Sequence, residues 1–94
     1  MTHELNTTAL IARCRSLAEE CESVSTRLTL PGRRSQMSVE SFKSYINLNW
    51  LAGSLQKSDT PDEWLEITYA YLQTIKHNLP GWKAAAAYIE RESK

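Results

Sequence analysis

Apolar residues recur at alternating spacings of four and three through the first third of the chain. This is a heptad pattern, which is typical of a helix that packs against other helices. Apolar residues at neighbouring positions widen the stripe beyond a two-stranded seam, which favours a bundle. The seam consists of Leu10, Cys14, Leu17, Cys21, Val24 and Leu28, and Ile11 and Ala18 widen it. We expect Asn6 or Thr7 to cap this helix, which should end before Pro31.

A second helix is predicted from a cap at Ser38 to about Lys57, and it is apolar on two sides. The side that we assign to the core carries Val39, Phe42, Ile46 and Trp50. The opposite side carries Leu48, Leu51 and Leu55. What covers these three leucines is the main question that the sequence raises.

The leucine side has two interpretations. Either the first or a fourth helix of the chain covers it, or it contacts another chain, because a contiguous apolar patch on a domain usually marks an interface. Neither applies if Gly53 ends the helix early. Since a chain of 94 residues has little interior, we assign the leucines to a partner.

The clearest helix start in the sequence lies at "TPDEW". Thr60 can cap the helix, Pro61 suits the first helical position, and Glu63 completes a capping box. The third helix should run to about Asn78, where "LPGW" ends it. A short fourth helix should follow over residues 82–91. The expected core stripes are Trp64, Leu65, Thr68, Leu72, Ile75 and Leu79 in the third helix and Trp82, Ala85, Ala86 and Ile89 in the fourth.

The pattern therefore predicts an all-α fold, with residues 1–94 forming a single small helical-bundle domain. Its three long helices have short connections, which implies antiparallel neighbours, and a short C-terminal helix completes the bundle. No segment alternates as a strand does. A chain of 94 residues buries only about 60–65% of its unfolded surface, so association with another chain would add stability.

The composition narrows the functional classes. The chain is 41% hydrophobic and 23% charged, which indicates a folded protein, and eleven basic residues balance eleven acidic ones, so no net field attracts nucleic acid or a membrane. The N-terminus lacks the basic and apolar regions of a signal peptide, and no apolar run reaches about 20 residues. We expect a cytoplasmic protein that binds no membrane and no cofactor.

Cys14 and Cys21 are expected to be reduced, buried thiols. Seven helical residues separate their Cα atoms by about 10.5 Å, which is too far for a disulfide within the helix. No CxxC pair or nearby His completes a metal site. An interchain disulfide in a symmetric dimer is the alternative.

A small basic group lies in and near the first connection. Arg27, Arg33 and Arg34 are candidate contacts for a phosphate or an acidic partner, although a solvated basic turn is the commoner case. The best helix-turn-helix candidate would place "PDEWLE" at the start of its recognition helix, and these acids would repel a phosphate backbone. The sequence therefore argues against DNA recognition.

The sequence contains no evident catalytic set. It has no glycine-rich phosphate loop and no Ser or Cys beside an obvious base. Arg13 and Arg15 point in different directions from the first helix. The chain is similar in size to all-α chorismate mutases, which dimerise through long helices, but these need several converging basic residues. The second helix carries no pattern of basic residues that could converge with Arg13 and Arg15. We therefore assign no mutase site to this chain.

These observations predict a non-enzymatic protein–protein interaction module. It would either self-associate as a homodimer or dock as a subunit, adaptor or inhibitor on a larger assembly. The expected partner-binding residues are Leu48, Leu51, Leu55, Ile67 and Tyr71, the last two from a ledge on the third helix. A helical subunit that supports nucleic acid through the basic turn is the alternative, and a small mutase-type enzyme is the third.

Overall fold

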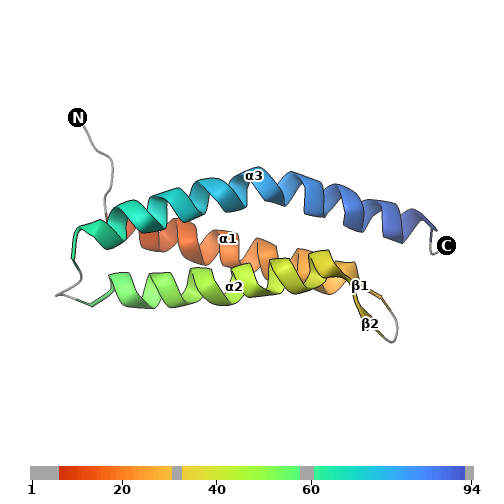
Figure 1. Cartoon of the computed structure of the whole chain (residues 1–94), viewed down its shortest axis with the longest axis horizontal. Helices are drawn as coiled ribbons and strands as arrows, with labels where there is room; N and C mark the ends of the chain where they lie inside the picture. Colours follow the sequence, from red (N-terminus) through yellow and green to blue (C-terminus); the bar gives the residue numbers. More distant parts are fainter. Residues whose placement is uncertain (1–6, 31–32, 58–60, 93–94) are drawn as a thin grey trace.

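The computed structural model describes residues 7–30, 33–57 and 61–92, and these form three long helices (Figure 1). The chain runs up, down and up again in an elongated body of 49 × 25 × 16 Å. The predicted all-α class is confirmed. The elements are α1 (Thr7–Leu28), the two-residue strands β1 (Thr29–Leu30) and β2 (Arg33–Arg34), α2 (Gln36–Leu55) and α3 (Glu63–Glu92).

The heptad seam of α1 lies in the core, as predicted. Its six residues are each no more than 9% exposed, and both cysteines are fully buried. Ala18 is buried beside the seam, and Ile11 packs against the core from its edge. Because α1 packs against both α2 and α3, its buried face is wider than the narrow stripe of a two-stranded coiled coil.

The connection between α1 and α2 differs from the plain loop that the sequence suggests. β1 and β2 pair in antiparallel register, with Thr29 opposite Arg34 and Leu30 opposite Arg33. Pro31, which was expected to stop the helix, lies outside the described residues, although α1 does end before it.

The second helix begins earlier than predicted, because Ser35 and not Ser38 is its cap. The Ser38 backbone N–H donates to Ser35 Oγ over 3.0 Å, which satisfies one of the free donors of the first turn. Ser35 Oγ in turn donates to the carbonyl of Leu28, the last residue of α1. One serine thus caps α2 and ties it to the end of α1.

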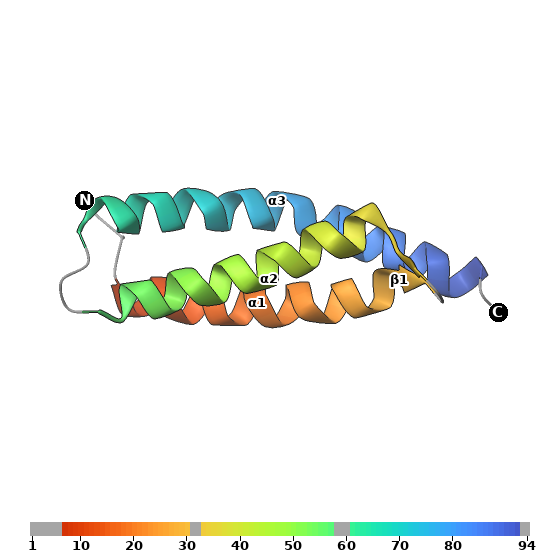
Figure 2. The same cartoon turned by 60° about the horizontal axis from the view of Figure 1, so that its bottom comes forward.

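Small polar side chains join α1 to α2 near this connection. Ser25, Ser38 and Ser41 are at most 1% exposed. Ser25 Oγ donates to the Ser38 carbonyl over 2.9 Å, and Ser38 Oγ donates to the Ser25 carbonyl over 3.1 Å. Because each hydroxyl has a partner, serines can fill a tight helix contact without an unsatisfied polar group. Figure 2 shows the two helices side by side.

The two faces of α2 are the reverse of the prediction. Leu48, Leu51 and Leu55 are only 0%, 7% and 4% exposed and belong to the core, whereas Ile46 and Trp50 are 50% and 58% exposed. The predicted leucine patch on the surface is therefore wrong, and the alternative in which the chain itself covers the leucines is correct. The reason is that the buried serines share the leucine side, and α1 packs against that side.

The separate fourth helix is also wrong, because α3 continues through Pro80 to Glu92. A proline inside a helix costs about 3 kcal/mol, since it lacks the N–H and crowds the preceding turn. Leu79 and Trp82, on either side of Pro80, are both 6% exposed in the core. Burial of such side chains contributes about 1.5–3 kcal/mol each, which offsets the proline. The axis of α3 changes direction about midway (Figure 1).

The start of α3 lies two residues later than predicted, at Glu63. The N–H groups of Trp64 and Leu65 donate to the carbonyls of Pro61 and Asp62, three residues earlier in each case. The proposed cap, Thr60, lies outside the described residues. The predicted core stripe is confirmed from Thr68 to Leu79, all of whose members are buried, while Trp64 and Leu65 are half-buried at its edge.

Candidate protein-binding surface

An open groove of about 250 Å³ lies between the second half of α2 and the first half of α3. We call it the α2–α3 groove. Both of these helices pack mainly against α1 and contact one another little, so a furrow remains where they face. Its lining is mostly apolar and consists of Asn47, Trp50, Leu51, Ile67 and Tyr71.

Large apolar side chains are exposed on both edges of the groove. On α2, Ile46 and Trp50 are four residues apart, so they lie one turn apart on the same side. On α3, Ile67 is 48% exposed. The indole rings of Trp50 and Trp64 lie 5.5 Å apart at a tilt of 58°, which connects the two edges at one end of the groove.

The apolar surface continues along the outside of α2. Val39 and Phe42 are half-buried and share the spacing of Ile46 and Trp50. We call these four residues the outer stripe. The stripe is the side of α2 that the sequence assigned to the core, and in the structure it faces away from α1.

A polar contact crosses the groove. Asn47 Nδ2 donates to the Tyr71 hydroxyl over 3.1 Å, which ties α2 to α3. Leu51, only 7% exposed, contributes apolar surface beside it. The groove therefore has an apolar lining with one polar pair, a composition that suits an apolar side chain with at most one hydrogen bond.

The predicted partner-binding residues separate into two groups. Leu51, Ile67 and Tyr71 do line the groove, whereas Leu48 and Leu55 are core residues that another chain cannot reach in this fold. Ile46, Trp50 and Asn47 were missed. The spacing of Ile46 and Trp50 was visible in the sequence, but a regular apolar stripe indicates burial without indicating what buries it.

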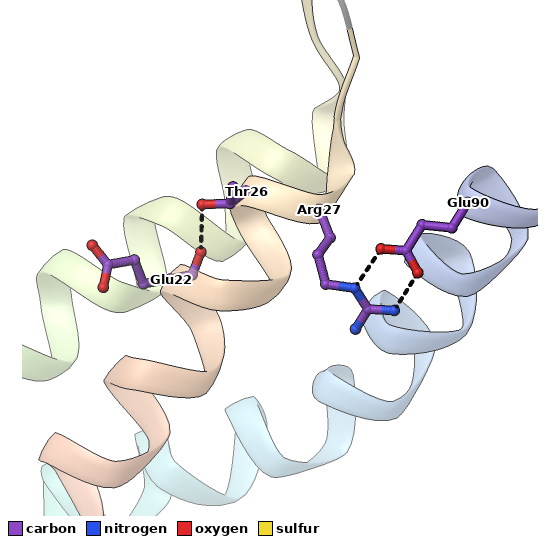
Figure 3. A network of polar contacts seen from close by, with 4 residues as sticks. All are labelled: Glu22, Thr26, Arg27 and Glu90. Carbon is purple, nitrogen blue, oxygen red and sulfur yellow. Dashed lines mark hydrogen bonds and ion pairs between the residues drawn. The ribbon is translucent and has the colours of Figure 1, made fainter. Parts of the chain in front are cut away.

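Arg27, one of the three predicted basic contacts, is paired with a carboxylate of its own chain. The Arg27 guanidinium donates through Nε and Nη2 to the two carboxylate oxygens of Glu90, over 2.8 and 2.9 Å (Figure 3). The hydrogen bonds that Arg27 donates to Glu90 raise the pKa of Arg27 above its already high ordinary value. Arg33 and Arg34 form β2. The fork that was expected to hold a phosphate is thus engaged by a carboxylate of the same chain.

A polar depression of about 400 Å³ lies between α1 and α3 beside this ion pair. It contains Glu19, Glu20, Arg27 and Lys83, so its charges balance. Lys83 Nζ lies 2.8 Å from Glu20 Oε1, which pairs the second base as well. Both pairs join α1 to the part of α3 beyond Pro80, and their role is to fasten that segment.

The two thiols lack the features of a reactive cysteine. Burial raises the pKa of Cys14, although Arg15 and Arg13 oppose the shift. Burial, with a smaller effect of Glu20, raises the pKa of Cys21 to about 11. Both groups are therefore neutral thiols near pH 7, and the thiolate is the reactive form. Their position in the seam matches the structural role predicted for them.

Within residues 7–30, 33–57 and 61–92, no three His, Cys, Asp or Glu side chains gather as metal ligands would. Over the same residues, no helix combines the length and the hydropathy of a bilayer-crossing segment. No protein-family model matches the chain, and no curated protein or solved structure is significantly similar to it.

Proposed function

We propose that this chain is a non-enzymatic protein-interaction module that binds another protein through the α2–α3 groove and the outer stripe. The observation that carries the proposal is that Trp50 and Ile67, each about half exposed, line one apolar groove, and that the equally exposed Ile46 lies one helical turn from Trp50. Single exposed apolar residues are ordinary on proteins, but a contiguous patch of large ones is typical of an interface.

The size and chemistry of the groove support a protein over a small molecule. Pockets for drug-sized ligands occupy about 300–1,000 Å³, and this groove, at about 250 Å³, is smaller and open. Its dimensions suit the side chains of another protein. Tryptophan and tyrosine are also enriched among the residues that contribute most to protein binding.

The exposed apolar side chains supply a favourable contribution to binding. Full burial of a large apolar side chain contributes about 1.5–3 kcal/mol, and three such side chains are about half exposed here. In the free chain the exposed parts of these side chains remain in water, so this stabilisation is gained only when a partner covers them. We further propose that the protein works in the cytoplasm, where a reducing environment would keep Cys14 and Cys21 as the free thiols described above.

Site-specific photo-crosslinking in cells tests the proposal. A photo-reactive phenylalanine analogue at position 67 should form covalent adducts with protein. The matched control is position 69, which is 41% exposed against 48% for Ile67. Two helical residues correspond to about 200°, so Tyr69 points to the other side of the same helix.

Adducts at position 67 and none at position 69 would support the proposed surface. Equal adduct formation at both positions, or none at position 67, would contradict it. Repeating the experiment at position 46, on α2, examines the other edge of the groove independently.

A further inference from the structure

We propose that the end of α3, residues 82–92, is a hinged segment that opens as one unit while the rest of the bundle stays folded. We call this segment the α3 arm. Its hinge is the pair Pro80 and Gly81, and two ion pairs to α1 hold it closed. The inference concerns a different part of the molecule from the α2–α3 groove and does not depend on the proposed function.

Two successive residues weaken α3 where the arm begins. Pro80 has no N–H to donate to the carbonyl four residues earlier, and its ring crowds the preceding turn. Gly81 has the lowest helix propensity of any residue except proline. A Cβ atom at Gly81 would meet no neighbouring atom within 4 Å, so packing does not require a glycine at this position. The pair therefore concentrates the weakness of the helix at one point.

Few buried side chains hold the arm to the bundle. Within the arm only Trp82 and Ala86 are buried, and Ala85 and Ile89 pack at the edge of the core. Because α2 contacts α3 little, α1 is the main support of the arm. The end of the arm also projects past the end of α1 (Figure 2). The arm is therefore the part of α3 with the least support from the rest of the chain.

Much of the remaining attachment is electrostatic and exposed. Lys83 Nζ lies 2.8 Å from Glu20 Oε1, and Arg27 Nε lies 2.8 Å from Glu90 Oε2. The four side chains are 38–50% exposed, so both pairs are weak and are screened by salt. One pair lies near the start of the arm and the other near its end, so together they fasten its whole length.

The arm should lose its helix when it leaves α1. Isolated helices shorter than about 12–15 residues are marginal in water, and the arm is shorter than this. Opening would therefore break its backbone hydrogen bonds and transfer the Trp82 side chain into water. Val24 of α1, which is 1% exposed and lines the depression beside Lys83, would be uncovered at the same time. The open form thus exposes an apolar surface that the closed form hides.

Hydrogen exchange of the backbone amides, resolved by residue with NMR, measures the opening, because the exchange rate reports the free energy of local opening. The amides of residues 86–90 should exchange faster than those of α1 and at similar opening constants. Gly81→Ala should slow them about 5-fold, which corresponds to the roughly 1 kcal/mol between glycine and alanine in a helix. Pro80→Ala strengthens the same point and is the second variant if Gly81→Ala fails to fold.

Salt tests the part that the ion pairs play. Raising NaCl from about 0.05 to about 0.5 M should speed exchange at residues 86–90 about 2–5-fold, since it weakens two exposed pairs. The double variant Glu20→Gln with Glu90→Gln should exchange faster at low salt and should lose this salt dependence.

The matched control is Gly53→Ala in α2, where an added Cβ also meets no atom within 4 Å. It should slow exchange in α1, which requires global unfolding, and leave residues 86–90 unchanged. Equal slowing of residues 86–90 by both alanine variants would mean that the arm opens only with the whole bundle. Protection that declines steadily towards residue 92 and ignores Gly81→Ala would mean simple fraying. Either result, or an exchange rate that salt does not change, would overturn the inference.

Discussion

Replacing Thr68 with valine should make the protein more stable. Thr68 is fully buried on α3, and its hydroxyl has no hydrogen-bond partner among the described residues. A buried hydroxyl without a partner costs about 1–3 kcal/mol, because its hydrogen bonds to water are lost on folding and are not replaced. Valine has nearly the same shape, and its helix propensity is close to that of threonine. The free energy of unfolding should therefore rise by about 1–2 kcal/mol.

Thermal unfolding followed by circular dichroism measures the effect. For a chain of this size, each 1 kcal/mol corresponds to about 4–8 °C in Tm. The matched control is Thr74→Val on the same helix. Thr74 is exposed, and its hydroxyl donates to the Ala70 carbonyl over 3.2 Å, so this variant should stay within about 0.5 kcal/mol of the parent. Both variants are compared at one chain concentration, since association adds to apparent stability.

A result in which Thr68→Val is no more stable than the parent would refute the reasoning. It would mean that the hydroxyl has a partner in solution, for example the carbonyl four residues earlier, which is the usual acceptor for a helical threonine. Thr68→Ser measures the packing contribution of the methyl group on its own. Serine keeps the hydroxyl and loses the methyl group, so it should be less stable than the parent in either case.

Four further outcomes are expected from changes in the core. Leu48→Ala should lower the free energy of unfolding by about 2–5 kcal/mol in urea titrations, and Leu51→Glu should abolish cooperative melting, because both side chains are internal. Ser38→Ala should lower it by about 1–3 kcal/mol, since Ser25 and Thr29 lose a buried partner. The pKa of Cys21 is raised from 9.0 to about 11, so the stability that its neutral thiol supports is complete below pH 9 and is lost as the pH rises through 11. Chemical denaturation at pH 8 and pH 10.5 should show a larger decline for the parent than for Cys21→Ala.

The first helix could be predicted from sequence because its seam is regular. The heptad from Leu10 to Leu28 has no interruption, and any packing partner must meet that stripe. The end of α3 could not be predicted in the same way. A proline normally breaks a helix, but the contacts of Leu79 and Trp82 with the core lie outside any local window, and they outweigh the local rule.

The orientation of α2 could not be predicted because hydropathy and packing disagree along it. Ser38, Ser41 and Ser44 count as polar in any pattern, yet all three are buried. Their hydroxyls donate to helix carbonyls, which removes the penalty of burial. Hydropathy alone therefore placed the aromatic side of α2 inside. The groove itself combines Trp50 with Ile67, and no helical periodicity relates residues on two different helices.

The choice of serines at the α1–α2 contact has a direct consequence for function. The serines themselves bury little apolar area where they join α1 to α2, whereas the outer stripe carries Phe42, Ile46 and Trp50. If α2 were turned to bury that stripe, the leucine side would become exposed, the serines would lose their hydrogen bonds and the groove would disappear. The hydrogen-bonded cap at Ser35 and the paired hydroxyls of Ser25 and Ser38 fix the rotation of α2 against this alternative. Burial of the aromatic stripe is thereby left to whatever chain binds it.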